Sequence, residues 1–255
     1  MLSYQHLYHA GNAADVHKHA ALALALDYLT RKPKPLSYIE THAGRGLYDL
    51  DAPEARKTAE AAQGITRLRA AFPADHPYIT ALNAQPGGLY PGSPAIARAL
   101  LRETDHLHLA ELHPQEFAAL QGSLRGANIS VHKQDGFTLA QSLCPPTPRR
   151  GLMLVDPSYE VKADYTRIPK WLAGITRKWN VGVVMIWYPL LSSGAQTQMV
   201  AALQRAHPDA LTHEVRFPPA RAGHGMIGSG VFIVTPPFGL DAGLAHLSGI
   251  FAGLT

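Results

Sequence analysis

The residues Gly151-Leu152-Met153-Leu154-Val155-Asp156-Pro157-Ser158-Tyr159 indicate the fold class of this 255-residue chain. A run of apolar residues ends on a carboxylate, and such a run is typical of a strand buried on both faces of a parallel sheet. In an open α/β sheet, ligands bind at the carboxyl ends of the strands. Asp156 and the residues that follow it are therefore candidates for a functional site.

Strands and helices alternate along most of the chain on either side of this stretch. The predicted strands are 36–41, 106–112, 129–133 and 181–187, and the predicted helices are 93–102, 114–121, one ending at 143, 165–179 and 195–206. This alternation predicts an α/β sheet with helices on both faces. The last two predicted strands, 211–217 and 230–235, have no helix between them, so we expect them to pair antiparallel. Such a closing hairpin is a feature of methyltransferase-type sheets and not of all-parallel dinucleotide-binding sheets.

The first third of the chain departs from this alternation. Asn12 and Asp15 are candidate caps for a helix that runs up to Pro33. The segment 47–92 does not fit a tight connection between a strand and a helix; it contains a predicted helix, 53–72, and then a stretch rich in proline and glycine. We interpret this segment as an inserted helical subdomain, with residues 1–46 and 93–255 forming the main domain.

Composition sets limits on partners and location. The chain has 23 Lys and Arg against 19 Asp and Glu, a net charge of +4, which permits a polyanionic partner without requiring one. The single cysteine, Cys144, excludes an intramolecular disulfide and a Cys-based zinc site. The chain starts without a secretory signal pattern, and its longest apolar run, 181–191, is too short to span a membrane. We therefore expect a cytoplasmic protein.

Four predicted strand ends carry residues suited to a ligand. The first leads into Glu40-Thr41-His42-Ala43-Gly44-Arg45-Gly46, whose glycines allow the backbone to approach a ligand closely. The second ends on Glu111, which suits the two hydroxyls of a ribose, and the third on Asp135-Gly136, which suits an adenine amino group. Each acid could instead cap the helix that follows it. In combination with Asp156, their order fits one nucleoside-shaped ligand.

The tetrad Asp156-Pro157-Ser158-Tyr159 points to chemistry on an exocyclic amine. Such an amine is a poor nucleophile because its lone pair is delocalised into the ring. A carboxylate and a backbone carbonyl that accept its two hydrogens favour the pyramidal nitrogen that attacks a methyl group, and proline fixes the direction of that carbonyl. The aromatic residue at the fourth position can stack on a base. The alternative is an Asp-Pro turn followed by a surface tyrosine.

The tetrad resembles the Asp-Pro-Pro-Tyr motif of amino-group methyltransferases. The wider pattern resembles the RlmJ family of 23S ribosomal RNA adenine-N6 methyltransferases, over nearly the whole chain and in the same order. The matching strings are Met1-Leu2-Ser3-Tyr4, His9-Ala10-Gly11-Asn12, Asp15, Lys18-His19, Thr41-His42-Ala43-Gly44, Tyr90-Pro91-Gly92-Ser93-Pro94, Glu111-Leu112-His113-Pro114 and Trp187-Tyr188-Pro189. The sequence departs from the family at Ser158, where proline is usual.

The resemblance implies a Rossmann-like class I methyltransferase fold with a helical insertion and with S-adenosyl-L-methionine as the methyl donor. It implies Asp156 as the catalytic residue and 23S ribosomal RNA as the partner; we expect no membrane partner, no metal and a monomer. Carried over by position, the donor-binding residues are His19, His42, Ser93, Glu111, Asp135 and Gly136, and the substrate-binding residues are Tyr4, Lys18 and Tyr159.

Other features leave alternatives open. His17-x-His19 is spaced wrongly for a helical metal pair, so we expect no zinc. Trp171, Trp179, Trp187 and Tyr188 are expected to be mostly core residues. The basic residues of the insertion and the helix after it form either an RNA-binding face or a solvated surface: Arg45, Arg56, Lys57, Arg67, Arg69, Arg98 and Arg102. Methylation of DNA adenine or of a protein glutamine, and a non-catalytic RNA-binding protein, remain alternative functions.

Overall fold

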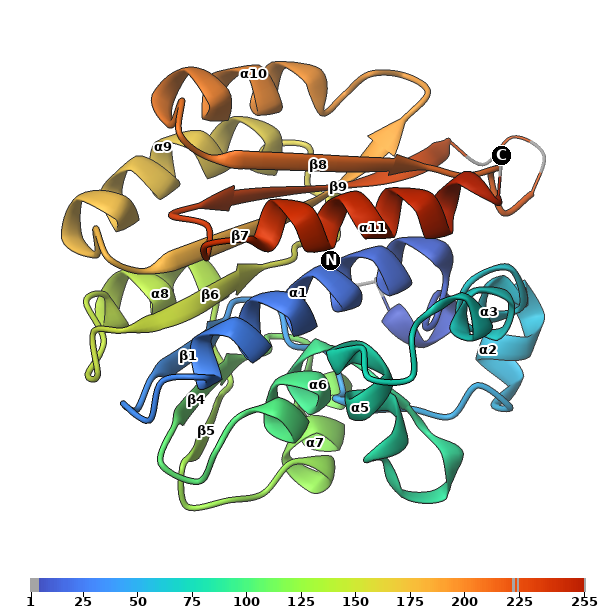
Figure 1. Ribbon diagram of the computed structural model, residues 1–255, viewed down its shortest axis with the longest axis horizontal. Helices are drawn as coiled ribbons and strands as arrows, with labels where there is room; N and C mark the ends of the chain where they lie inside the picture. Colours follow the sequence, from blue (N-terminus) through green and yellow to red (C-terminus); the bar gives the residue numbers. More distant parts are fainter. Residues whose placement is uncertain (1–4, 222, 224, 255) are drawn as a thin grey trace.

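The computed structural model describes residues 5–221, 223 and 225–254, and its centre is a seven-stranded sheet (Figure 1). The strand order is β5-β4-β1-β6-β7-β9-β8. Five strands are parallel: β1 (Ser37–Glu40), β4 (His106–Ala110), β5 (Ile129–His132), β6 (Gly151–Val155) and β7 (Val183–Leu191). The carboxyl ends of these five strands therefore meet along one edge of the sheet, as the sequence predicted.

The closing hairpin consists of β8 (Leu211–Arg216) and β9 (Met226–Val234), which pair antiparallel. The last strand, β9, lies between β7 and β8 and is antiparallel to both. The predicted hairpin is thus confirmed. The chain has the Rossmann-like fold of class I methyltransferases, with a reversed strand near one side of the sheet.

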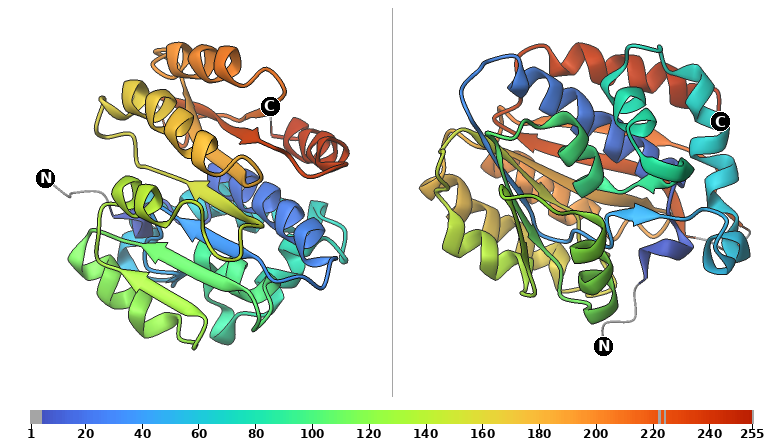
Figure 2. Two further views of the ribbon diagram at one scale, coloured as in Figure 1. Left: turned by 90° about the vertical axis from the view of Figure 1, so that its left-hand side faces the viewer. Right: turned by 90° about the horizontal axis from the view of Figure 1, so that it is seen from below.

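Helices cover both faces of the sheet (Figure 2). One face packs against α1 (Ala13–Thr30), α6 (Ser93–Leu100), α7 (Pro114–Ser123) and α11 (Leu240–Ala252), and the other against α8 (Gly136–Leu143), α9 (Asp164–Lys178) and α10 (Thr197–Ala206). Along β6, Leu152 and Leu154 face the first group, whereas Met153 and Val155 face the second. Burial on both faces explains why this strand lacks polar alternation.

The insertion begins and ends in a short antiparallel pair, β2 (Leu47–Tyr48) with β3 (Tyr90–Pro91). The prediction of one helix over 53–72 is wrong. The structure has α2 (Pro53–Thr58), α3 (Glu60–Gln63), α4 (Ile65–Leu68) and a 3-10 turn (Arg69–Ala71). The second break lies at Gly64, where an added Cβ would lie 2.0 Å from the Gly11 carbonyl oxygen. Close packing on the start of α1 therefore interrupts the helix.

Two helices were missed in the sequence. The first, α5 (Pro77–Asn83), lies in the stretch that we described only as rich in proline and glycine, and it begins at Pro77, although proline is favoured in the first turn of a helix. The second, α11, buries Leu240, Leu244, Leu247 and Phe251, which recur at helical spacing. Short 3-10 turns at His6–Tyr8 and Pro86–Gly88 complete the elements.

The insertion contributes to the core of the main domain. Ile65, Leu68, Tyr78 and Leu82 belong to the same apolar cluster as α1. The division into two domains stays a prediction. Within the part of the chain that the structure describes, no helix has the length and apolar character needed to cross a membrane.

Candidate active site

A cavity of about 580 Å³ lies at the carboxyl ends of the parallel strands. It is lined by every predicted site residue that the structure describes: Lys18, His19, His42, Ser93, Glu111, Asp135, Gly136, Asp156 and Tyr159. Tyr4, the remaining predicted residue, lies outside the described residues. The fold thus gathers side chains from α1 and from the ends of four strands around one space.

The glycine turn after β1 is held by the carboxylate at the end of β4. Gly44 has a φ of +63°, a conformation that glycine adopts without strain, and its N–H donates to Glu111 Oε2 at 2.8 Å. Glu111 Oε1 accepts from the His113 N–H at 2.7 Å. Each carboxylate oxygen keeps a further lone pair, so Glu111 can still accept hydroxyl groups of a ligand.

The carboxylate after β5 both caps a helix and lines the cavity. Asp135 Oδ1 accepts from the Thr138 N–H at 2.8 Å and the Thr138 hydroxyl at 2.7 Å, at the start of α8. The capping role that we left open is therefore present, and both of these bonds use the same oxygen. At the neighbouring Gly136, a Cβ would meet the Thr41 carbonyl oxygen at 1.8 Å, so only glycine fits there.

Glu40, at the end of β1, is a buried acid that the sequence analysis did not single out. Its Oε2 accepts from the Tyr38 hydroxyl at 2.8 Å, and its Oε1 accepts from the Ser93 hydroxyl. Burial raises the pKa of Glu40 to about 8, so the side chain is largely protonated at neutral pH. Ser93 therefore reaches the cavity as part of a neutral, hydrogen-bonded group. The sequence could have identified Glu40 as a candidate site residue, because it is an acid near the end of a predicted strand.

Asp156, at the end of β6, forms an ion pair with Lys18 of α1. Lys18 Nζ donates to Asp156 Oδ2 at 2.6 Å and lies 3.0 Å from Asp15 Oδ1. Burial alone would lower the pKa of Lys18, but Asp15 and Asp156 outweigh it and raise the pKa. The Lys18 side chain is 5% exposed, whereas the Asp156 side chain is 13% exposed. Of the pair, Asp156 is thus the more accessible partner.

Asp15, three residues before Lys18 on α1, is the second carboxylate paired with this lysine. Its Oδ2 accepts from the Gly11 N–H at 2.9 Å and lies 2.8 Å from His6 Nε2. Burial alone would raise the pKa of Asp15, but His6 and Lys18 lower it well below its usual value. Asp15 was a candidate helix cap in the sequence, but Asn12 is the cap, since its Oδ1 accepts from the Asp15 N–H at 2.8 Å.

Tyr159 lies beneath the cavity and is only 7% exposed. Its hydroxyl donates to the Trp187 carbonyl oxygen at 2.7 Å, and its ring stacks on Tyr165 with centroids 4.7 Å apart. The surface-tyrosine alternative is therefore wrong. Trp187 also lies near this ring, with centroids 6.0 Å apart, so Tyr159 meets the cavity with only a small part of its surface.

Trp187 lines the cavity and is the exception in a group of four aromatic residues that we expected to be mostly core. Its Nε1 donates to Ser229 Oγ at 2.9 Å, and Lys18 Nζ lies 5.5 Å from its ring centroid. The other three aromatic residues of that group, Trp171, Trp179 and Tyr188, are buried as expected. Only the strand-end position of Trp187 distinguished it from them in the sequence.

The two histidines of α1 diverge into different networks. His17 hydrogen-bonds to Ser229 Oγ at 2.8 Å and to His213 Nδ1 at 2.9 Å. His19 hydrogen-bonds to the Tyr90 hydroxyl at 2.8 Å, and burial lowers its pKa to about 3. Among the described residues, no three His, Cys, Asp or Glu side chains are grouped so that they could hold a metal.

Several basic residues proposed for an RNA-binding face are engaged within the protein. Arg45 pairs with Glu116 at 2.6 Å, and Arg102 pairs with the buried Asp105 at 2.8 Å. Arg56 pairs with Asp51 at 2.9 Å, but both side chains are largely exposed. Arg45 and Arg102 therefore stabilise the fold, and the choice between an RNA-binding face and a solvated surface stays open for the exposed residues of the insertion.

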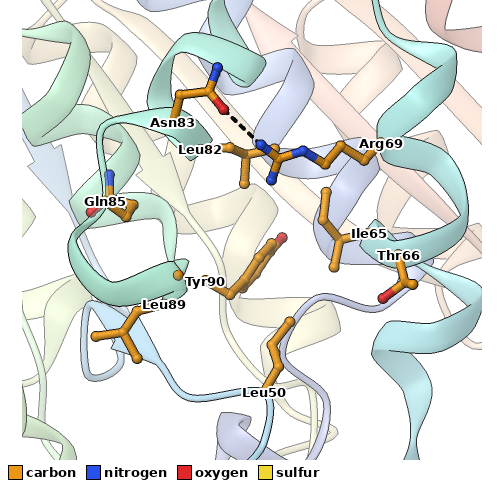
Figure 3. A pocket seen from close by; sticks show the side chains of 10 residues that line it. Leu50, Ile65, Thr66, Arg69, Leu82, Asn83, Gln85, Leu89 and Tyr90 are labelled. Carbon is orange, nitrogen blue, oxygen red and sulfur yellow. Dashed lines mark hydrogen bonds between the residues drawn. The ribbon is translucent and has the colours of Figure 1, made fainter.

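A second cavity, of about 390 Å³, lies in the insertion between α4, α5 and β3 (Figure 3). Arg69 points toward the amide of Asn83 and donates to its Oδ1 at 2.7 Å. The described residues that line this cavity include no carboxylate. It thus lacks a carboxylate that could accept hydrogen bonds from an amine. The candidate site is therefore the cavity around Asp156.

Comparisons with known proteins agree with this architecture. A family model described as "Ribosomal RNA large subunit methyltransferase D, RlmJ" matches residues 33–252. The chain is 38% identical over 250 residues to ribosomal RNA large subunit methyltransferase J of Escherichia coli K12, covering 94% of this chain and 89% of the relative. It is 35% identical over 257 residues to the Haemophilus influenzae protein of the same name, covering 97% and 92%.

Solved structures extend the comparison to the fold. The crystal structure of a Legionella pneumophila protein superposes with a TM-score of 0.86 at 33% identity, over 96% of this chain and 94% of that one. Spermidine synthase from Thermotoga maritima has a TM-score of 0.51 at 11% identity, over 88% of this chain and 61% of that one, which is a likeness of fold alone.

Proposed function

Because the chain belongs to the RlmJ family of ribosomal RNA large subunit methyltransferases, we propose that it transfers a methyl group from S-adenosyl-L-methionine to the N6 amine of one adenine in 23S ribosomal RNA. Family membership supports an RNA acceptor over DNA adenine or a protein glutamine. It also supports an enzyme over a non-catalytic RNA-binding protein.

The observation that carries the proposal is the meeting of two sets of groups in one cavity. Asp156, the acceptor for an amine, shares the cavity with Glu111 and Asp135, the acceptors for a nucleoside. A methyl donor bound at Glu111 and Asp135 and an adenine bound at Asp156 would lie next to each other in one cavity. Methyl transfer requires this proximity, since the two reacting atoms must approach directly.

The residues present fit the methyl donor. Gly44 and Gly136 allow the turn after β1 to pack closely on Tyr48 and the start of α8 to pack closely on Thr41. Glu111 has lone pairs for ribose hydroxyls, and Asp135 Oδ2 is available beside the oxygen that caps α8. His42 is held beside the glycine turn by a 2.8 Å hydrogen bond between its Nδ1 and Thr41 Oγ1, and burial lowers its pKa to about 4. When bound, the donor supplies an electrophilic methyl group on a sulfonium.

His19 and Ser93 reach the donor side of the cavity as neutral groups. Burial lowers the pKa of His19 to about 3, and Ser93 donates to Glu40, so neither adds a positive charge beside a sulfonium. Their role in this proposal is to shape and to hydrogen-bond the donor pocket.

The acceptor amine is placed by the tetrad. Lys18 occupies Asp156 Oδ2, which leaves Oδ1 to accept one N6 hydrogen, while the Pro157 carbonyl accepts the other. These two bonds direct the nitrogen lone pair away from the ring plane, toward the methyl group. The proton released from the methylated amine then has an acceptor at Asp156 Oδ1.

Lys18 and Tyr159 act on the acceptor side in this proposal. Lys18 fixes the carboxylate orientation, and the ring of Tyr159, which packs on Tyr165 and Trp187, lines the side of the cavity where the adenine would lie. Tyr4 belongs to the same proposal through its position in the family motif. Ser158 is exposed, so the replacement of the usual proline leaves Asp156 and Pro157 in place.

The decisive experiment measures transfer of a labelled methyl group from S-adenosyl-L-methionine to protein-free 23S ribosomal RNA, followed by digestion and nucleoside analysis. We expect N6-methyladenosine at a single site. Parallel reactions with duplex DNA and with protein acceptors test the alternatives, and transfer to either of them but not to RNA would refute the proposed substrate. Size-exclusion chromatography tests the proposed monomer, and cell fractionation tests the proposed cytoplasmic location.

A further inference from the structure

The amino ends of the parallel strands form a second polar edge of the sheet, opposite the cavity. In Figure 1 the turn after α1 and the turn before β6 both lie on the left, and the left panel of Figure 2 views the molecule from that side. The basic edge, as we define it, comprises Arg31, Lys32, Lys34, Arg102, Arg149, Arg150 and Lys178. Each of these residues lies in a segment that leads into β1, β4, β6 or β7.

These four strands are neighbours in the order β4-β1-β6-β7. With neighbouring strands about 5 Å apart, their amino ends fall within about 15 Å. Segments that are far apart in the sequence, such as 31–35 and 149–150, are therefore placed side by side. The topology alone gathers seven basic residues on one side of the molecule.

Hydrogen bonds fix the loops of the basic edge to one another. Arg102 Nη1 donates to the Lys32 carbonyl oxygen at 2.7 Å, and Arg102 Nη2 donates to the Lys34 carbonyl oxygen at 2.9 Å. Arg150 Nη1 donates to the same Lys34 oxygen at 3.1 Å. Burial and the neighbouring Arg102 both lower the pKa of Arg150. Two guanidinium groups are thus held close together although they repel each other.

Carboxylates neutralise only part of this charge. Asp27 pairs with Arg31 at 2.7 Å, and the buried Asp105 pairs with Arg102 at 2.8 Å. Glu103 is a further exposed acid nearby. Among the described residues, no ion pair is recorded for Lys32, Lys34, Arg149, Arg150 or Lys178, and all of these except Arg150 are exposed. An excess of positive charge therefore faces solvent at this edge.

The opposite edge has the reverse character. The cavity is lined by seven acidic side chains, Asp15, Glu111, Glu116, Asp135, Asp156, Glu160 and Asp164. Of the lysine and arginine side chains that line it, Lys18 is buried and paired with Asp15 and Asp156, and Arg167 pairs with Asp135 at 3.4 Å. The groups around the cavity can position an adenine and a donor, but they offer little attraction for a polyanion. Long RNA needs cationic side chains elsewhere on the surface.

From this charge distribution we infer that the basic edge binds the phosphate backbone of the RNA substrate, at a segment distant from the methylated adenine. The inference rests on the proposed function for the identity of the RNA. Lys32, Lys34 and Arg149 make the phosphate contacts, and Arg102 and Arg150 hold the loops that carry them. The contacts are independent of base sequence, since phosphate contacts position RNA without reading it.

The test compares two double variants of equal charge change. Lys32→Glu/Lys34→Glu alters the basic edge, whereas Lys170→Glu/Arg205→Glu alters exposed residues of α9 and α10. Equilibrium binding of a 23S transcript is measured at several salt concentrations, with thermal melting as a check of folding. We expect the first variant to bind about tenfold more weakly and the magnitude of its log–log salt slope to fall by about 1.5, as for two lost phosphate contacts. The control should stay near wild type.

Equal weakening by both variants, or unchanged binding by the first, would overturn the inference. A neutral pair, Lys32→Gln/Lys34→Gln, should show about half the effect on affinity. In methylation assays, the first variant should raise KM for the full transcript but not for a short stem-loop that carries the target adenine. RNA binding that depends on the basic edge without methyl transfer by the wild type would refute the proposed function and leave this inference standing.

Discussion

The candidate site is built from two regions that satisfy their polar groups in different ways. At the strand ends, Glu111 and Asp135 accept backbone N–H groups two and three residues further along the chain, at His113 and Thr138. On α1, Lys18 is paired with Asp156, which lies 138 residues away, and His17 is bonded to Ser229, 212 residues away. Glu111 and Asp135 thus take part of their support from residues next to them in the chain, although Glu111 also accepts from the Gly44 N–H, 67 residues away. Lys18 and His17 depend on partners in distant segments.

The difference has consequences for stability and for function. A carboxylate held by nearby backbone donors keeps its place whenever the strand and the next helix form. A buried lysine or histidine on α1 is satisfied only when the whole sheet has assembled around it. We therefore expect changes at the strand ends to affect ligands first, and changes on α1 to affect the folded state as well.

The largest expected effect is that of Asp156→Ala. Removal of the amine acceptor should lower the rate of methyl transfer by about 10³-fold, while donor affinity stays within about twofold. Lys18 retains Asp15 at 3.0 Å, so the fold should persist. Single-turnover transfer and calorimetric donor binding measure the two quantities. Loss of donor binding together with activity would show that Asp156 holds the donor and not the amine.

Lys18→Met sharpens the contrast from the side of α1. The variant removes the lysine from the buried Asp15, which keeps His6 Nε2 at 2.8 Å, and also from Asp156. It should lower the free energy of unfolding by about 3 kcal/mol as well as reduce transfer. The matched control is Arg31→Met, which breaks the exposed pair with Asp27 and should cost less than about 1 kcal/mol. Denaturant unfolding compares them. If both variants lost the same free energy of unfolding, burial of the charged residues on α1 would not be what makes them important for stability.

The pH dependence of stability tests the buried histidines. Burial lowers the pKa of His17 in the folded protein well below 6.5. Below pH 6.5 the unfolded chain takes up a proton at His17 that the folded protein does not, so stability present above pH 6.5 is lost as the pH falls. The loss is about 1.4 kcal/mol per pH unit. His17→Gln should reduce this slope between pH 6.5 and 5, and an unchanged slope would refute the assignment.

The smallest expected effect separates the two roles of Asp135. Serine is also a good helix cap, so Asp135→Ser should change stability by less than about 0.5 kcal/mol, whereas Asp135→Ala should cost about 1 kcal/mol. Both variants lack the second carboxylate oxygen and should weaken donor binding by about tenfold. Melting curves and calorimetry distinguish the two roles. Full donor affinity in the serine variant would leave Asp135 as a cap only.

Much of the sheet and its ligand-binding edge was predictable from the sequence. The apolar run that ends at Asp156, the acids at Glu111 and Asp135, and the absence of a helix before β9 are patterns within short segments. Each pattern reflects the preferences of neighbouring residues for burial, turns and caps. The structure places the described predicted site residues around one cavity, because parallel strands share a carboxyl edge.

What required the tertiary structure is the set of contacts between distant segments. The close approach of Gly64 to the Gly11 carbonyl breaks a segment whose local pattern favours one long helix. Asp15 resembles a helix cap in the sequence, yet it pairs with the lysine that holds Asp156.

The sequence by itself determined the strands of the main sheet, most of the helices that alternate with them, and the chemistry at the strand ends, because these depend on residues that are close along the chain. Only the tertiary structure decided which charged groups are buried next to one another, as are Asp15, Lys18 and Asp156. It also decided which charged groups lie close together on the surface, as in the basic edge. Burial and electrostatic interaction depend on distance in space, and that distance exists only after the chain has folded.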